Sequence, residues 1–375
     1  MESKKILLVQ LYSNGDCLYA TAVARQIKQD HPGCHLTWAI ASFCKNIITG
    51  NPYIDAIMEV NTVAKDDIAA FRKFKKDLYG QHNKFDEIFI THNADTNQAF
   101  YDGCIRSSIL RAYPYPLTVP VTPVLNLSEA EVERVKQFSF EHKLNNFTQV
   151  VLFEFAPQSR QLKITKEFAI AVAEEIVKNT DTAVILSSAQ KVIHENKAII
   201  DGSPLSLRET AALTHYCSLL IGCTSGITWI STSGAAKQLP MIQLLNAKTR
   251  WLNPVSRDFK RYNFPVDKVI ELIEFDKEKT VDCVRAALVN FTGAKNKFNQ
   301  DIPLNFKTTQ SIVYNLLCYL EFAAIAKHIK INRKVYGNNI SFYKEVILGF
   351  IVFPFKLIKN IIKKRLLVPK EKKLF

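Results

Sequence analysis

Short apolar runs alternate with stretches of helical periodicity through most of this chain, and this alternation restricts the fold more than any other feature. Lys5–Gln10 is an apolar, β-branched run, and apolar residues recur at helical spacing over residues 18–29. Further strands are predicted at His35–Ala41, Ala56–Val60 and Glu87–Thr91. Strands separated by helices form parallel sheets that helices cover on both faces, so the predicted fold class is α/β.

The same alternation starts again near residue 149. The predicted strands are Gln149–Phe155, Ala183–Ser188, Ser218–Gly222 and Pro240–Leu245, and the predicted helices are Lys166–Lys178, Ser206–Tyr216 and Gly226–Lys237. A proline-rich stretch and a helix start with capping-box spacing, Ser128 and Glu131, separate the two sets. We therefore predict an N-terminal domain over 1–148, a second α/β domain over 149–290, and a helical extension over 291–375.

The composition is typical of a folded protein with reduced thiols. Of the 375 residues, 47% are hydrophobic and 22% are charged, which is unlike a disordered chain. The eight cysteines are scattered and form no C-x-x-C pair, so we expect reduced and mostly buried thiols. The first apolar run is too brief for the core of a signal peptide, and we expect the chain to stay in the cytoplasm.

The turn after the first strand is the first candidate site. Ser13, Asn14 and Gly15 lead into Asp16 at the carboxyl end of that strand, which is the edge where open α/β sheets bind ligands. Asp16 is suited to act as a general base toward an acceptor hydroxyl. An Asp at a helix start also commonly caps the helix, so both roles are open. The G-x-G-x-x-G fingerprint is absent, which argues against a nicotinamide enzyme.

Two more candidates lie in the second α/β domain. Thr224, Ser225 and Gly226 form a turn between a predicted strand and a predicted helix, where free N–H groups and the helix dipole favour a diphosphate. An ordinary strand-to-helix turn is the alternative. Arg160 and Lys163 follow the first strand of this domain, where cations can neutralise a leaving diphosphate without a metal. Solvated surface charges are the alternative for these two.

These segments together resemble the ADP-heptose:lipopolysaccharide heptosyltransferases of glycosyltransferase family 9. The likeness covers residues 5–60, where a strand, a small-residue–Gly–Asp turn and a helix are followed by a His-Pro-Gly turn. It also covers residues 150–250, where Ser206–Leu213 and Leu219–Gly222 precede the glycine turn. The resemblance implies a GT-B fold, in which two Rossmann-like domains face a cleft.

The resemblance also implies an activity. It implies inverting, metal-independent transfer of a sugar from a nucleotide-diphosphate donor to a lipopolysaccharide or other cell-surface saccharide acceptor, with no cofactor. Asp16 matches the catalytic base of the family, and Arg160 or Lys163 matches the basic residue that meets the diphosphate. Thr224 stands where the family has an acid, and Trp229 where it has a histidine. These departures leave open a non-catalytic, membrane-tethered nucleotide-sugar-binding or scaffold protein.

The positive charge of the chain is concentrated at its C-terminus. The net charge is +14, and residues 327–375 contain thirteen Lys/Arg against two acidic residues. The apolar run Val346–Phe353 is far shorter than the about twenty residues that span a bilayer. From Phe355 onward, apolar residues and lysines alternate as in a basic amphipathic helix.

We therefore expect the tail to bind an anionic membrane surface, on the cytoplasmic face of the inner membrane. A helix docked on the body of the protein is the alternative. No nucleic-acid module is recognisable in the sequence, so no specific nucleic-acid binding is expected.

Overall fold

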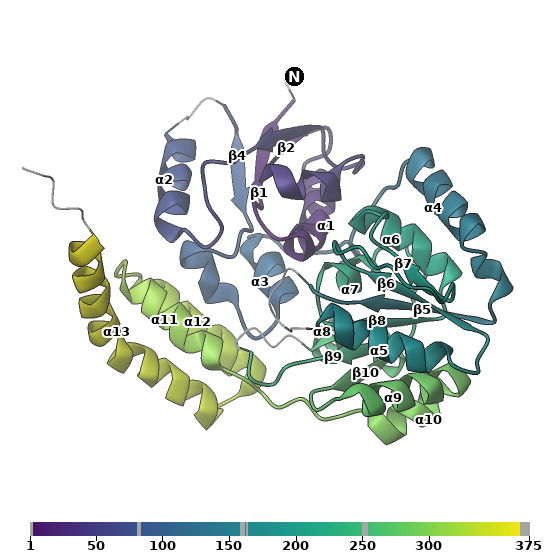
Figure 1. The fold of residues 1–375 in the computed structure, drawn as a ribbon. Coiled ribbons are helices and arrows are strands. Elements are labelled where there is room, and N and C mark those ends of the chain that lie inside the picture. The colour runs from purple at the N-terminus through teal and green to yellow at the C-terminus, as the bar shows by residue number, and fades with distance from the viewer. Residues whose placement is uncertain (1–2, 81–83, 158–161, 163, 250–253, 368–375) are drawn as a thin grey trace, which may run out of the picture.

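Two separate parallel sheets form the framework of the protein (Figure 1). The computed structural model describes residues 3–80, 84–157, 162, 164–249 and 254–367. The first sheet has four strands in the order β3-β2-β1-β4, and the second has six in the order β10-β9-β8-β5-β6-β7. Every pairing in both sheets is parallel, as the alternation of strands and helices predicts.

The first sheet and its helices make up what we call the N-terminal half. Its elements are β1 (Lys5–Val9), α1 (Asn14–Asp30), β2 (His35–Ile40), η1 (Ser42–Ile48), β3 (Ala56–Glu59), α2 (Ile68–Tyr79), β4 (Glu87–Ile90), η2 (Asp95–Phe100) and α3 (Ile105–Ala112). Alternate residues of β1 enter different apolar clusters: Leu8 packs in the cluster that contains Leu18 of α1, whereas Leu7 packs in the one that contains Phe71 of α2. The central strand is therefore covered on both faces.

The second sheet and its helices make up the C-terminal half. Its elements are α4 (Glu129–Glu141), η3 (Leu144–Asn146), β5 (Gln149–Glu154), α5 (Lys166–Val177), β6 (Thr182–Ser187), β7 (Ile199–Asp201), α6 (Leu207–Leu213), η4 (Thr214–Tyr216), β8 (Leu219–Gly222), α7 (Gly226–Ile230), β9 (Met241–Leu244), α8 (Val255–Arg261), η5 (Val266–Lys268), β10 (Val269–Leu272), α9 (Lys277–Val289) and α10 (Phe291–Phe298). The capping box predicted at Ser128 and Glu131 is present, and a second one joins Ser206 to Glu209.

The sequence prediction is wrong at one helix of this half. The helix predicted over Gly226–Lys237 ends at Ile230, after five residues. The hydroxyls of Ser231 and Thr232 bond back to the carbonyls of Ile227 and Trp229. Such side-chain bonds to the backbone compete with continued helix formation, so the segment that follows becomes a turn.

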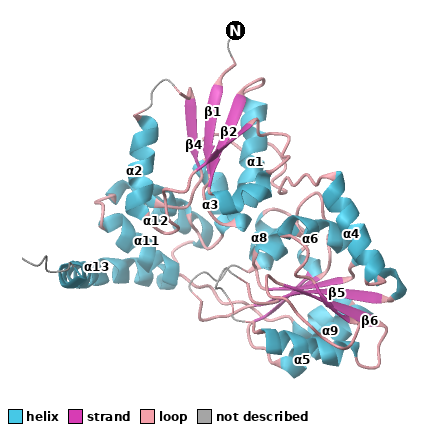
Figure 2. Cartoon of the chain, turned by 45° about the horizontal axis from the view of Figure 1, so that its top comes forward, coloured by secondary structure: helices cyan, strands magenta, loops and turns pink. Residues whose placement is uncertain are grey.

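Three helices after α10 return to the N-terminal half (Figure 2). They are α11 (Lys307–Leu317), α12 (Phe322–Tyr336) and α13 (Ile340–Leu367), and we call them the C-terminal helices. They share an apolar cluster with Ala99 and Tyr101, and Glu321 accepts from Arg72 of α2 at 2.9 Å. α13 is one helix that contains Pro354 rather than a helix that starts at Phe355. Within the described residues, no helix is both long and apolar enough to cross a bilayer.

The cysteines agree with the prediction of buried, reduced thiols. All eight are free, and all but Cys318 are buried.

Candidate functional site

Asp16 lies in the first turn of α1, directly after β1 ends. The residue at the N-cap position is Ser13, which has a φ of 65°, and its side chain makes no capping hydrogen bond. Asp16 is therefore three residues inside the helix and does not occupy the cap, which removes the capping alternative that its sequence position left open. Ser13, Asn14 and Gly15 stand beside it at the carboxyl edge of the first sheet, as predicted.

The surroundings of Asp16 prepare its carboxyl group for proton transfer. Burial raises the pKa of Asp16 to about 7, and the nearby charge of Asp66 raises it as well, whereas Lys65 lowers it. A carboxyl group with a pKa near neutrality can take a proton and release it again at cellular pH. The geometry and electrostatics of Asp16 are thus those of a candidate general base.

His92 is a residue at this edge that the sequence analysis missed. It follows β4, the strand that pairs with β1, and it lies against the rings of Tyr12 and Phe71 at centroid distances of 5.9 and 4.9 Å. Burial, reinforced by Lys65, lowers the pKa of His92 to about 4, so the imidazole is neutral at physiological pH. A search for polar residues after every strand of the first sheet finds this histidine, because parallel strands end at one edge.

The second turn connects β8 to α7 and contains Thr224, Ser225 and Gly226. Thr224 has a φ of 56°, and its backbone N–H donates to Oε1 of Gln243 at 2.9 Å. The Ser225 hydroxyl donates to the Glu154 carboxyl group at the end of β5. Both side chains are buried, and the Ser225 hydroxyl stabilises the turn from within, so the backbone is the part of the turn suited to face a ligand.

Glu154 is a second residue that the sequence analysis missed. It is 3% exposed, and burial raises its pKa to about 7, against the lowering effect of hydrogen bonds from Cys223. Its Oε2 atom has no hydrogen-bond partner among the described residues. A carboxyl group that can hold or release a proton near neutral pH therefore lies beneath the second turn. In the sequence, Glu154 is a charged residue within the apolar run Gln149–Phe155. This interruption of the run is the only sequence feature that indicates it.

Helices α1 and α7, which begin at the two turns, touch each other. A Cβ atom placed on Gly15 would lie 3.2 Å from Cδ1 of Trp229, the fourth residue of α7. Trp229 donates from Nε1 to the carbonyl of Thr224 at 3.1 Å, and its ring meets Tyr19 of α1 edge-on at 5.2 Å. The structure thus places the helix that carries Asp16 against the helix that follows the second turn. Arg160 and Lys163 lie outside the described residues.

A buried charge pair joins the two halves close to this contact. Arg106 of α3 and Asp258 of α8 are both fully buried, with Nη2 and Oδ1 3.2 Å apart. The Arg106 guanidinium is surrounded by aromatic rings at 4.7 to 5.9 Å, contributed by Tyr19, Trp229, Tyr262 and Phe264. Stacking on rings suits a planar and weakly hydrated cation, so this arginine links both halves to the helix that carries Asp16.

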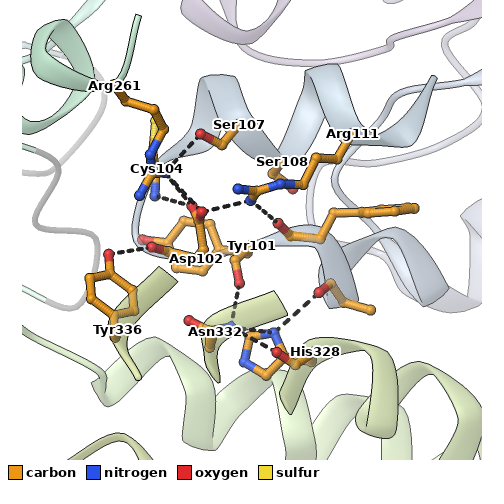
Figure 3. A network of polar contacts seen from close by, with 12 residues as sticks. Tyr101, Asp102, Cys104, Ser107, Ser108, Arg111, Arg261, His328, Asn332 and Tyr336 are labelled. Atoms are coloured by element: carbon orange, nitrogen blue, oxygen red, sulfur yellow. Dashed lines mark hydrogen bonds and ion pairs between the residues drawn. The ribbon is translucent and has the colours of Figure 1, made fainter. Parts of the chain in front are cut away.

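A second polar network fastens the C-terminal helices to the same region, as Figure 3 shows. Asp102 accepts from Arg111 of the N-terminal half at 2.6 Å and from Arg261 of the C-terminal half at 2.7 Å. The Tyr336 hydroxyl donates to the backbone carbonyl of Asp102 at 2.6 Å, and Asn332 donates to that of Tyr101 at 3.0 Å. The segment before α3 therefore connects both halves and α12.

One small hollow in the described part of the chain lies away from both turns. It is mostly apolar and is lined by Leu239, Met241, Phe259 and Phe264 among others, and neither turn contributes to it. The candidate site therefore consists of the two turns and not of this hollow.

About three quarters of the chain is similar in fold to solved bacterial structures, among them the following two. A glycosyl transferase family 9 protein from Veillonella parvula aligns with a TM-score of 0.53 and 16% identity, over 77% of this chain and 99% of that one. The ADP-heptose LPS heptosyltransferase II of E. coli aligns with a TM-score of 0.51 and 15% identity, over 76% and 99%. The sequence matches no protein-family model and no curated protein. The predicted two-domain GT-B fold is confirmed, and identity this low establishes the fold alone.

Proposed function

We propose that this chain is a glycosyltransferase, which moves a sugar from a nucleotide-diphosphate donor to a saccharide acceptor. The observation that carries the proposal is the position of Asp16, a carboxyl group with a pKa of about 7 that is not engaged as a helix cap. It lies at the edge of one Rossmann-like half, next to Gly15, which faces Trp229 of the other half. Ligands of α/β proteins bind at such edges. The GT-B fold shared with two sugar-transfer proteins supports the same conclusion.

In the proposed reaction, ionised Asp16 takes the proton of an acceptor hydroxyl. The oxygen then forms a bond to the anomeric carbon of the donor, while the bond from that carbon to the diphosphate oxygen breaks and its electron pair stays on the phosphate. Attack from the face opposite the leaving group inverts the anomeric configuration. Neutral His92 stands at the same edge and is suited to hydrogen-bond an acceptor hydroxyl without competing for the proton.

The donor diphosphate is proposed to meet the turn at Thr224, Ser225 and Gly226, together with Arg160 and Lys163. The role of the turn is supported by its place at the carboxyl end of β8, directly against the turn that carries Asp16. Two cations can balance the charge that develops on the leaving diphosphate, so this scheme needs no metal ion. The resemblance to the heptosyltransferases points to an inverting reaction and to an acceptor on lipopolysaccharide or another cell-surface saccharide.

A second candidate function is a non-catalytic nucleotide-sugar-binding or scaffold protein. It is favoured by Trp229, whose ring fills the space beside Gly15, and by Thr224, which stands where the related family has an acid. In that case Asp16 would have no proton to transfer, and the contact between the turns would be structural.

Donor binding followed by turnover separates the two candidates. Thermal unfolding of the wild type and of Arg160→Ala/Lys163→Ala is measured with a panel of nucleoside diphosphates and nucleotide sugars, because a ligand of the folded state raises Tm. A ligand that stabilises the wild type and not the double variant supports the proposed diphosphate site. Turnover of that donor, abolished by Asp16→Asn, supports the transferase. Binding without any turnover by the wild type supports the scaffold.

The proposed place of action is the cytoplasmic face of the inner membrane, where a lipid-linked acceptor is available. This part of the proposal is supported by the basic C-terminal sequence, with thirteen Lys/Arg after residue 326.

A further inference from the structure

Helix α13 exposes a row of apolar side chains along one side. The strip consists of Ile340, Ile347, Ile351, Phe355 and Ile358, which recur at spacings of seven, four, four and three residues and so share one side of a helix. Each of these side chains is more than half exposed. Single exposed apolar residues are ordinary on a protein surface, whereas five in one row mark an interaction surface. We call this row the outer strip.

The opposite side of α13 is packed against α11. Phe342 meets Phe306 at a ring distance of 5.6 Å, and Phe353 meets Tyr314 at 6.1 Å. Between them, Gly349 lies so close to Val313 that a Cβ atom on the glycine would come within 2.7 Å of it. The alternative of a helix docked on the body of the protein therefore holds for this inner side of α13. The orientation of α13 is fixed, and the outer strip is held outward.

The C-terminal helices are in turn held on the N-terminal half. Arg72 of α2 pairs with Glu321 at 2.9 Å, and Lys327 stacks on the ring of Phe100 at 3.9 Å. Buried His328 and Asn332 of α12 bond to backbone carbonyls at Ala99 and Tyr101, as Figure 3 illustrates for the second of these. Both ribbon views place α13 at the outer edge of the N-terminal half, away from the second sheet.

We infer that the outer strip docks on an anionic lipid bilayer and holds the N-terminal half against the membrane. Bilayer lipid is the occupant that the charges favour, because Lys344 interrupts the strip and α12 exposes Lys327, Lys330, Arg333 and Lys334. Exposed apolar side chains on a helix, with cations on the same group of helices, are typical of proteins that lie in the membrane interface. The inferred surface places the α13 helix flat on the bilayer.

Docking through α13 implies that the acceptor is anchored in lipid, and this part of the inference rests on the proposed function. Asp16 belongs to the half that α13 would hold at the bilayer, so an acceptor anchored in lipid would reach the base from the membrane side. The C-terminal half, which contains the proposed donor turn, has its sheet away from α13 and would remain toward the soluble donor. Docking itself requires no catalysis and can be tested without a substrate.

The experiment measures co-sedimentation of the full-length chain with vesicles of phosphatidylcholine alone and of phosphatidylcholine with phosphatidylglycerol. The test variant is Ile347→Glu/Ile351→Glu, because both side chains are more than half exposed and their replacement leaves the packed side of α13 intact. The matched control is Ile193→Glu/Val289→Glu, which adds the same two charges at positions that are 81% and 90% exposed on the C-terminal half. Ile347→Ser/Ile351→Ser repeats the test without added charge.

We expect the wild type and the control to bind the anionic vesicles, and both strip variants to bind at least about tenfold more weakly, since each isoleucine loses its burial in lipid. Wild-type protein that fails to bind anionic vesicles overturns the inference, and so do strip variants that bind like the wild type. If the wild type is a dimer that the strip variants dissociate, with vesicle binding unchanged, a second copy covers the strip and the inference is wrong.

The same protein samples separate this inference from the proposed function. Tm shifts with nucleotide sugars are measured on each variant in the absence of vesicles. Vesicle binding that persists while no nucleotide sugar binds contradicts the transferase and leaves the docking surface standing. Donor binding without vesicle binding contradicts the docking surface and leaves the proposed glycosyltransferase standing.

Discussion

Trp229 of α7 lies directly beside Gly15, at the start of α1, across the boundary between the two halves. The space for a Cβ atom on Gly15 is limited by the indole ring, with Cδ1 at 3.2 Å. The indole also anchors the second turn through the hydrogen bond from Nε1 to the carbonyl of Thr224. Trp229 therefore connects the helix that carries the proposed base to the proposed donor turn, and a donor that binds between Gly15 and Trp229 must separate them.

Replacing Asp16 by Asn removes the proposed base with little change of shape. We expect turnover to fall by roughly 10²- to 10⁴-fold, while the donor still raises Tm. The matched control is Asp77→Asn, an exposed carboxylate on α2 that pairs with Lys73, and it should keep full turnover. Full activity in Asp16→Asn would exclude this residue as the base.

The pH dependence of turnover should report the same carboxyl group. Because a general base works in its ionised form and the pKa of Asp16 is about 7, kcat/KM should rise with pH and level off above about 7. Lys65→Ala removes a charge that lowers this pKa, so the rise should move to higher pH. Asp66→Asn removes a charge that raises it, so the rise should move to lower pH. If neither substitution shifts the pH dependence of kcat/KM, Asp16 is not the general base.

Glu154 should make the protein less stable as the pH rises. Its pKa increases from 4.5 to about 7 on folding, so between these values the folded state keeps a proton that the unfolded chain has released. The free energy of unfolding should therefore fall across this window, by about 3 kcal/mol from this group. Glu154→Gln keeps an acceptor for Ser225 and removes the titration.

Chemical denaturation at pH 5 and at pH 8 tests the role of Glu154. The Gln variant should resemble the wild type at pH 5 and exceed its stability at pH 8. Glu133→Gln changes a side chain that is 72% exposed and should leave both values unchanged. Equal loss of stability at both pH values would mean that Glu154 acts through packing alone.

Replacing one partner of the buried pair Arg106 and Asp258 should lower the free energy of unfolding strongly. Arg106→Met leaves a fully buried carboxyl group without its cation, and we expect a loss of about 3 to 5 kcal/mol in the free energy of unfolding. Arg134→Met, in contrast, removes an arginine that is 59% exposed and should cost less than about 1 kcal/mol. Urea denaturation compares the two, and equal losses would contradict the special role of the buried pair.

Gly222 should tolerate no larger residue. A Cβ atom there would lie 2.5 Å from the Thr228 hydroxyl and 2.9 Å from Nε2 of Gln243, so Gly222→Ala should destabilise the protein by about 1 to 3 kcal/mol. Gly234→Ala is the control, because nothing lies within 4 Å of its Cβ position. Thermal unfolding of the two variants measures the difference. If Gly222→Ala unfolds like the wild type, the turn is looser than the structure indicates.

The sequence by itself determined the elements whose signals are local. The alternation of apolar runs and helical periodicity identified both parallel sheets, and the spacing of Ser128 and Glu131 identified a capped helix start. The strand–turn–helix at Ser13–Asp16 was likewise readable, because strand and helix signals lie within a few residues of each other.

Only the tertiary structure decided which of these elements meet. The sequence around Gly15 does not predict its contact with Trp229. Likewise, Glu154 is an isolated polar residue in the sequence, and only the fold places Ser225, which follows a different strand, beside it. The return of α13 to the N-terminal half also depends on packing between distant segments. Local patterns follow from backbone geometry and side-chain spacing, whereas these contacts and the pKa shifts follow from burial, which exists only after distant parts of the chain have packed together.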